Sequence, residues 1–234
     1  MKIKKTSTII TSKVVTYIQE QQEKVRQHYI HRSIPLMVKD FPSSEHVSIK
    51  AIIKFLEENI PPHLMRSVDA VYIGEFPELE DRNAVFADGA IYCRNDEATN
   101  YDFLENIVHE IAHSLIDRLW LSDEASERVK KEFLGKRERL RMILNSEGYK
   151  LPKKYYVNME YSPAFDEFLS QTVGYPRLLN LTMGLFVSPY GATSLEEYFA
   201  NAFENFYLED PDDVKKISPA LYDLIVQLHQ EEDN

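Results

Sequence analysis

Apolar residues recur every three or four positions through several long segments of the chain, which is the spacing of amphipathic helices. Phe103, Ile107, Ile111 and Leu115 form one such stripe. Prolines and hydroxyl-bearing residues interrupt the pattern at points where helices start or stop, with Asn100, Ser122 and Ser194 as expected N-caps. The pattern predicts helices over Val14–Ile30, Val47–Ile60, Asn100–Trp120, Ser122–Asn145, Ser194–Tyr207 and from Pro211 to Gln230.

Two short regions have the pattern of β-strands. Ala70–Ile73 is an apolar run of strand length, and Ala84–Ala87 and Ala90–Arg94 flank Asp88-Gly89, a pair that favours a tight hairpin turn. Prolines and serines between 35 and 44 predict a loop, and 153–193 has no regular period. We therefore expect a mainly helical α+β fold with a small sheet and hairpin before the helix at 100–120.

No change in composition divides the chain, so a single domain over 1–234 is expected. Its predicted parts are an N-terminal helical part at 1–66, the sheet, hairpin and first long helix at 67–120, an inserted helix and loop at 121–187, and two closing helices at 188–234. The basic run at 128–141 is interpreted as a solvated helix face with Glu–Lys partners, rather than as a docking site.

Composition narrows the classes of function. The net charge of −11 argues against a dedicated nucleic-acid-binding protein, which usually has a basic face. No glycine-rich phosphate loop occurs, no apolar run is long enough to span a membrane, and Cys93 is the lone cysteine. The N-terminal residues do not resemble a secretory signal, so we expect a cytoplasmic protein or one delivered by a route without a signal peptide.

The segment His109-Glu110-Ile111-Ala112-His113 is an HExxH motif. Two histidines four residues apart project from one side of a helix and can hold one Zn²⁺, and the intervening glutamate lies beside them as a candidate general base. His109 and His113 fall roughly opposite the apolar stripe, which argues against two buried core histidines. A solvated polar face would fit the same phase equally well.

A catalytic zinc site needs a third protein ligand. The helix that starts at Ser194 offers Glu197, with Glu196 as the fallback and Glu204 two turns further on the same face. Ser194 and Glu197 also form a capping-box pattern, in which the glutamate would reach back to the start of its own helix. Asp117, one turn after His113, is either an orienting partner of a ligand histidine or a solvated residue.

Together with the HExxH motif, two segments near the C-terminus carry a resemblance. The pair Tyr190-Gly191 followed by Glu197-Tyr-Phe-Ala-Asn-Ala-Phe203, and the segment Lys215–Ile225, are similar to the catalytic domain of anthrax lethal factor and its relatives, including the Pro-Pro endopeptidases. These are zinc peptidases of the gluzincin clan, and the similarity extends from the predicted hairpin to the C-terminus.

The resemblance implies a zincin-like fold in which His109, His113 and Glu197 bind zinc and Glu110 is the general base. It also implies that Tyr190 hydrogen-bonds the oxyanion of the tetrahedral intermediate. The chain departs from the family at Asn201, where a second glutamate is common, and in the longer interval between the HExxH motif and Glu197. Family members are mostly secreted, yet no leader is visible.

The function expected from these residues is a zinc-dependent endopeptidase that acts on a peptide or protein substrate. The strand Ala90–Arg94 is predicted to be a sheet edge that pairs with an extended peptide. The alternative is a non-catalytic structural or binding module, such as a phage or toxin assembly component, that retains a zinc site. A cytosolic regulatory protease would share the same chemistry. The sequence does not determine the oligomeric state.

Overall fold

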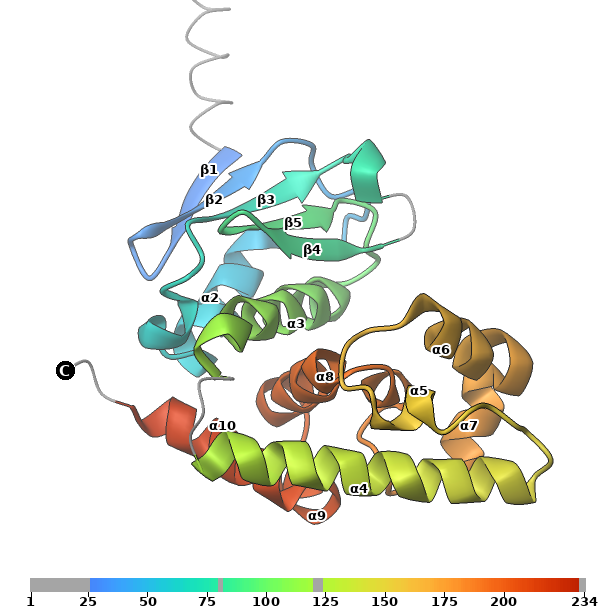
Figure 1. The fold of residues 1–234 in the computed structure, drawn as a ribbon. Helices are drawn as coiled ribbons and strands as arrows, with labels where there is room; N and C mark the ends of the chain where they lie inside the picture. Colours follow the sequence, from blue (N-terminus) through green and yellow to red (C-terminus); the bar gives the residue numbers. More distant parts are fainter. Residues whose placement is uncertain (1–25, 80–81, 120–123, 232–234) are drawn as a thin grey trace, which may run out of the picture.

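The computed structural model describes residues 26–79, 82–119 and 124–231, and the side chains of 117 and 118 lie outside this description. Within it the chain has an α+β architecture, with a five-stranded sheet in one half and a group of helices in the other (Figure 1). The helix α3 (Asn100–Leu119) lies under the sheet and packs against α8 (Leu195–Leu208), so it connects the two halves.

The sheet is mixed, with the strand order β1-β2-β3-β5-β4. Its strands are β1 (Gln27–Ile30), β2 (Ile34–Val38), β3 (Ala70–Gly74), β4 (Ala84–Ala87) and β5 (Ala90–Arg94). β3 is parallel to both β2 and β5, and the outer pairs β1–β2 and β5–β4 are antiparallel. One face of the sheet buries Leu36, Val71 and Ile91 in the core, which it shares with α2 (Ile49–Asn59) and α3.

The structure confirms the predicted hairpin and the strand at Ala70–Ile73, but it corrects which strand is the edge. β5 pairs on both sides, with β3 and with β4, so it has no free edge for a peptide. The terminal strand of the sheet on this side is β4. The prediction that Ala90–Arg94 would form the edge is therefore wrong by one strand of the hairpin.

The first predicted helix is also wrong where it can be compared. Residues 14–25 lie outside the described residues, but Gln27–Ile30 forms β1 and the expected loop around Pro35 contains β2. His31 and Arg32 both have positive φ angles (49° and 60°), as a tight turn between antiparallel strands requires. Because neither is a glycine or an asparagine, this turn lacks the residues by which a hairpin is usually recognised.

The second half is almost entirely helical. Its elements are α4 (Glu124–Ser146), α5 (Lys154–Val157), α6 (Pro163–Glu167), the π-helical segment η3 (Phe168–Gly174), α7 (Tyr175–Leu181), the 3₁₀ turn η4 (Pro189–Ala192), α8, α9 (Pro211–Ile217) and α10 (Pro219–Gln230). The irregular region at 153–193 thus consists of short helical pieces. The predicted last helix is two helices, because Pro219 begins a new one directly after Ser218.

Two N-terminal helix ends differ in how well the sequence predicted them. Ser194 caps α8 as expected, since its Oγ accepts the N–H of Glu197 at 3.1 Å. At α3 the cap is Thr99 rather than Asn100, because Thr99 and Asp102 exchange side-chain-to-backbone hydrogen bonds across the first turn. The Asn100 side chain instead accepts the N–H of Ser48, which joins α3 to the start of α2.

The basic run on α4 is only partly a solvated face. Lys130 and Arg141 pair with Glu127 and Glu138 three residues away, as expected. Arg137, in contrast, is 1% exposed and points into the protein. In the part of the chain that the structure describes, we find no helix with the length and apolarity needed to cross a membrane.

Candidate metal centre

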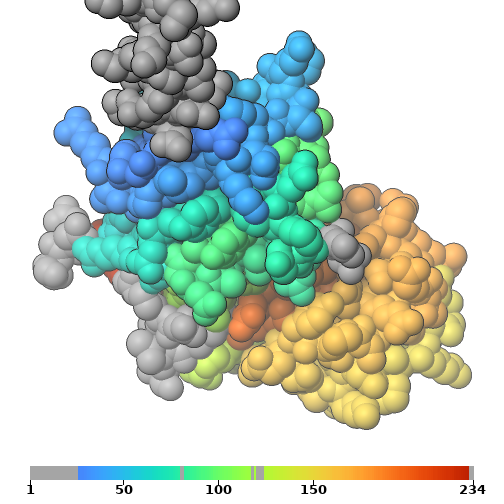
Figure 2. Space-filling model, turned by 90° about the horizontal axis from the view of Figure 1, so that it is seen from above, coloured from blue at the N-terminus to red at the C-terminus, as the bar shows by residue number. Residues whose placement is uncertain are grey.

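A cleft of about 570 Å³ lies between the sheet half and the helical half. Seen from above, it is a hollow between the green part of the sheet half and the yellow and orange segment of the helical half (Figure 2). It is lined by Arg82, Ala84, Val85, Phe86, His109, Glu110, His113, Ser114, Ile116, Tyr161, Tyr190, Glu196 and Glu197. The cleft thus gathers the residues of the HExxH motif and the two candidates from the C-terminal segment.

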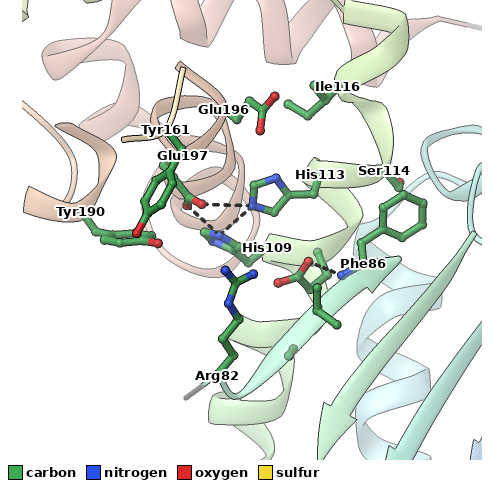
Figure 3. A pocket seen from close by; sticks show the side chains of 13 residues that line it. Arg82, Phe86, His109, His113, Ser114, Ile116, Tyr161, Tyr190, Glu196 and Glu197 are labelled. Carbon is green, nitrogen blue, oxygen red and sulfur yellow. Dashed lines mark hydrogen bonds and ion pairs between the residues drawn. The ribbon is translucent and has the colours of Figure 1, made fainter. Parts of the chain in front are cut away.

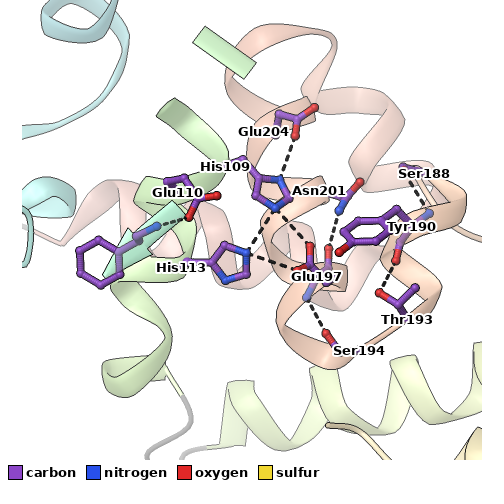
Figure 4. Close-up of polar contacts among 11 residues, drawn as sticks. His109, Glu110, His113, Ser188, Tyr190, Thr193, Ser194, Glu197, Asn201 and Glu204 are labelled. Carbon is purple, nitrogen blue, oxygen red and sulfur yellow. Dashed lines mark hydrogen bonds and ion pairs between the residues drawn. The ribbon is translucent and has the colours of Figure 1, made fainter. Parts of the chain in front are cut away.

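The two histidines and Glu197 point toward one another from α3 and α8 (Figure 4). The Nε2 atoms of His109 and His113 are 3.3 Å apart, and they lie 3.1 Å and 3.5 Å from the two carboxylate oxygens of Glu197. The fallback ligand Glu196 also lines the cleft, but it is not in this group. The capping-box alternative for Glu197 is therefore not what the structure shows, since its carboxylate faces the histidines.

These distances fit a zinc ion. Tetrahedral zinc with bonds of about 2.0–2.1 Å holds its ligand atoms about 3.3 Å from one another. The two Nε2 atoms already have that spacing, and each of them faces a different oxygen of Glu197; two imidazole nitrogens with one carboxylate oxygen are a common catalytic zinc set.

Glu204 holds His109 from the other side. Its Oε2 is 3.1 Å from Nδ1 of His109, so Nε2 of the same ring faces Glu197 (Figure 4). Carboxylates commonly orient metal-binding histidines in this way. Asn201, at the position where the resembled family has a glutamate, donates instead to the carbonyl of Glu197 at 2.8 Å. The helix period places Glu204 on the same face as Glu197, but no pattern in the sequence indicates its contact with His109.

Electrostatics couple the two helices. Burial lowers the pKa of His109, but its hydrogen bonds to Glu197 and Glu204 outweigh that effect and raise the pKa to about 10. Burial raises the pKa of Glu197, whereas the hydrogen bonds from His109 and His113 lower it to about 2. In the metal-free protein, a protonated His109 therefore sits between two carboxylates at neutral pH.

Glu110 is 9% exposed and lies in the cleft next to the histidines. Its Oε2 accepts the backbone N–H of Phe86, on the edge strand β4, at 2.6 Å (Figure 3). This contact fixes one carboxylate oxygen against the sheet and leaves the other without a hydrogen bond among the described residues. Asp117, the other acidic candidate on α3, has a side chain outside the described set.

Tyr190 lies on the turn η4, and its phenol points into the cleft near Glu197 (Figure 3). The ring of Tyr175 packs against it edge-to-face at 6.2 Å. Asp166 accepts the hydroxyls of both Tyr161 and Tyr175, at 2.7 Å and 2.5 Å. Of these three tyrosines, Tyr190 alone has no hydrogen-bond partner for its hydroxyl among the described residues, so that donor is available to a ligand.

The turn that carries Tyr190 is held in place by Arg137 on α4. Nη1 of Arg137 donates to the carbonyls of Ala192 and Thr193, and Nη2 donates to those of Tyr155 and Asn158. Burial lowers the pKa of Arg137 to about 9, so the group remains charged at neutral pH. No carboxylate of the described residues pairs with it, and backbone carbonyls take that role.

No family model, curated protein or solved structure matches this chain. The resemblance to the lethal factor catalytic domain therefore remains a prediction from the motifs.

Proposed function

We propose that this chain is a zinc-dependent endopeptidase with a zincin-like fold. The single observation that carries the proposal is the convergence of His109, His113 and Glu197 in the cleft, where one possible ligand atom from each residue lies within 4.8 Å of the others. A purely structural zinc site has four protein ligands, and the described residues supply three. When bound, zinc would polarise the substrate carbonyl and make water more acidic.

Glu110 has the position of the general base. Its carboxylate lies one residue from His109 in the wall of the cleft, with one oxygen anchored by Phe86. In this role Glu110 accepts a proton from the attacking water while the water oxygen forms a bond to the carbonyl carbon of the substrate. The same proton then goes to the amine nitrogen as the carbon–nitrogen bond breaks.

We assign to Tyr190 the role of hydrogen-bond donor to the carbonyl oxygen of the substrate. Its free hydroxyl can donate to that oxygen as negative charge develops there. Burial, followed by the charge of Glu197, raises the pKa of Tyr190, so the phenol keeps its proton at neutral pH. A protonated donor is what this role requires.

An extended peptide fits the cleft because one wall is the edge strand β4. Edge strands can bind a peptide by adding it as another strand, with backbone hydrogen bonds that do not depend on its sequence. This favours a peptide or protein substrate over a small molecule.

The decisive experiment measures metal content and peptide cleavage together. The purified protein should hold one zinc ion, and it should cleave members of a random peptide library, read by mass spectrometry, in a chelator-sensitive way. Glu110→Gln should keep the zinc and lose about 100-fold to 10,000-fold in rate, because only the proton acceptor is removed. Glu105→Gln, on the same helix but outside this cleft, is the matched control and should cleave normally.

Zinc binding without turnover of any library member would contradict the proposal. That result would support the alternative function, a non-catalytic structural or binding module that retains the metal site.

A further inference from the structure

The residue of interest is Arg82, which comes two positions before the edge strand β4. It lines the cleft, and its guanidinium points inward from the sheet side (Figure 3). Its role concerns the substrate of the proposed peptidase and therefore rests on that function.

The guanidinium of Arg82 has no hydrogen bond or ion pair with any residue that the structure describes. Several other arginines have partners: Arg94 pairs with Asp96, Arg141 with Glu138, Arg177 with Glu147, and Arg137 with four carbonyls. Arg32, Arg128 and Arg139 have none among the described residues either, but they lie outside the cleft. Among the described residues, Arg82 is thus a cation in the cleft whose five side-chain N–H donors have no partner.

Three acidic residues in or near the cleft, Glu197, Glu110 and Asp166, have hydrogen-bond partners other than Arg82. Glu197 is engaged by the two histidines, and one oxygen of Glu110 is fixed by the N–H of Phe86. Both oxygens of Asp166 accept phenol hydroxyls. A ligand of Arg82 would therefore not have to displace a partner among the described residues.

The charge of Arg82 acts across the cleft. It lowers the pKa of both Tyr190 and Tyr161, against larger effects of burial that raise them. These phenols lie on the helical side, whereas Arg82 comes from the sheet side. A peptide that reached the metal-binding residues would lie within the field of this cation.

We propose that Arg82 binds a carboxylate of the peptide substrate, so that the enzyme prefers peptides with an acidic group near the scissile bond. A guanidinium matches a carboxylate in shape and can donate two parallel hydrogen bonds to it. The net charge of −11 would by itself favour basic peptides, but that long-range attraction is screened over about 8 Å at physiological salt. A direct contact inside the cleft is screened much less.

The position of the acidic group follows from the strand. Arg82 lies four residues before Phe86, and the N–H of Phe86 donates a hydrogen bond to Glu110. An extended chain rises about 3.3 Å per residue. A peptide alongside β4 would therefore place its carboxylate about two to four residues from the scissile bond, after allowing for the length of the arginine side chain. The carboxylate is either an acidic side chain or the free C-terminus of a short peptide.

The test measures binding as well as cleavage. Fluorescent peptides cleaved by the wild type are remade with Glu, Gln or Lys at each position from two to four residues on either side of the scissile bond, with free or amidated C-termini. Binding is measured by anisotropy on zinc-loaded Glu110→Gln protein, and cleavage on the protein with Glu110 intact. Both measurements compare the parent with Arg82→Glu and with Arg128→Glu, an exposed α4 residue outside the cleft that changes the net charge equally.

We expect the carboxylate to improve binding at least tenfold over Gln or an amide, and Arg82→Glu to reverse this preference toward Lys. Arg128→Glu should leave the preference unchanged. A gain from Glu that survives amidation identifies a side chain, and a gain lost on amidation identifies the C-terminus; either supports the proposal. Equal preference in Arg82→Glu and Arg128→Glu overturns it, even if cleavage is normal. If acidic peptides from the unselected library bind through Arg82 but none is cleaved, the peptidase function fails and the carboxylate site stands.

Discussion

The two walls of the cleft are built in different ways. On the sheet side, His109, Glu110 and His113 come from one turn of α3, and the helix period alone places them on neighbouring positions. On the helical side, Glu197 and Tyr190 belong to α8 and the turn η4, and their places depend on contacts with distant parts of the chain. The first wall is local and the second is assembled.

The assembled wall has an unusual support. Arg137 joins two backbone segments that are more than thirty residues apart, at 155–158 and 192–193, and its guanidinium stacks 4.1 Å from the ring of Phe165. A local motif tolerates changes elsewhere in the protein, whereas an assembled one fails when its support is removed. Substitutions in the assembled wall and in its support test that difference.

The largest effect is expected from the ligand on the assembled wall. Glu197→Ala removes one of three donors, and by the scale of zinc sites this costs about 4 kcal/mol of binding free energy, close to a thousandfold in affinity. Competition with a chromophoric chelator measures it. Glu196→Ala is the matched control, because that neighbour lies outside the group of donor atoms. A larger loss of affinity in Glu196→Ala would show that Glu196, and not Glu197, is the metal ligand.

Removal of Arg137 should lower the stability of the fold more than it lowers the affinity for zinc. Arg137→Met leaves four carbonyls without their donor, and we expect the free energy of unfolding to fall by about 3 kcal/mol. Urea denaturation measures this, with the exposed Arg139→Met as control. Well below its denaturation midpoint, the variant should keep the zinc affinity but cleave more slowly, since the turn with Tyr190 is displaced. Unchanged stability would mean that the carbonyls find other partners.

The same contrast explains how far the sequence could be interpreted. The helix with His109 and His113, the hairpin at 84–94 and the cap at Ser194 follow from local periodicity and turn chemistry, and all are present. Arg137 could not be recognised, because a basic residue within a basic run resembles a solvated one until its burial is known. The strand β1 was missed for a related reason, since its pairing with β2 depends on a turn without glycine.

A smaller effect on zinc affinity is expected from Glu204, which lies on the helical wall and contacts His109 on the other wall. Glu204→Gln keeps a side chain of the same shape but removes the charge that faces Nδ1 of His109. Changes of this kind lower metal affinity by about 10-fold to 100-fold. Glu105→Gln, on α3 and outside the contact with His109, removes the same charge and is the matched control. An unchanged affinity in Glu204→Gln would show that His109 is oriented well enough by α3 alone.

The smallest difference between variants is expected in how steeply zinc affinity depends on pH, and it tests whether the walls are coupled. His109 has a pKa of about 10 in the metal-free fold, above its ordinary value of 6.5, because the carboxylates of α8 hold its proton. Its proton therefore stabilises that fold fully below pH 6.5, and this contribution is lost as the pH rises through about 10.

Zinc must displace the same proton, so its affinity should rise about tenfold for each pH unit between pH 6.5 and 8.5. The chelator competition, repeated across this range and corrected for protonation of the chelator, measures the slope. Glu204→Gln should give a shallower slope, because one of the two carboxylates that retain the proton has lost its charge. Equal slopes in both proteins would mean that the charge of Glu204 does not help to hold the proton of His109, and that Glu197 alone couples the two walls.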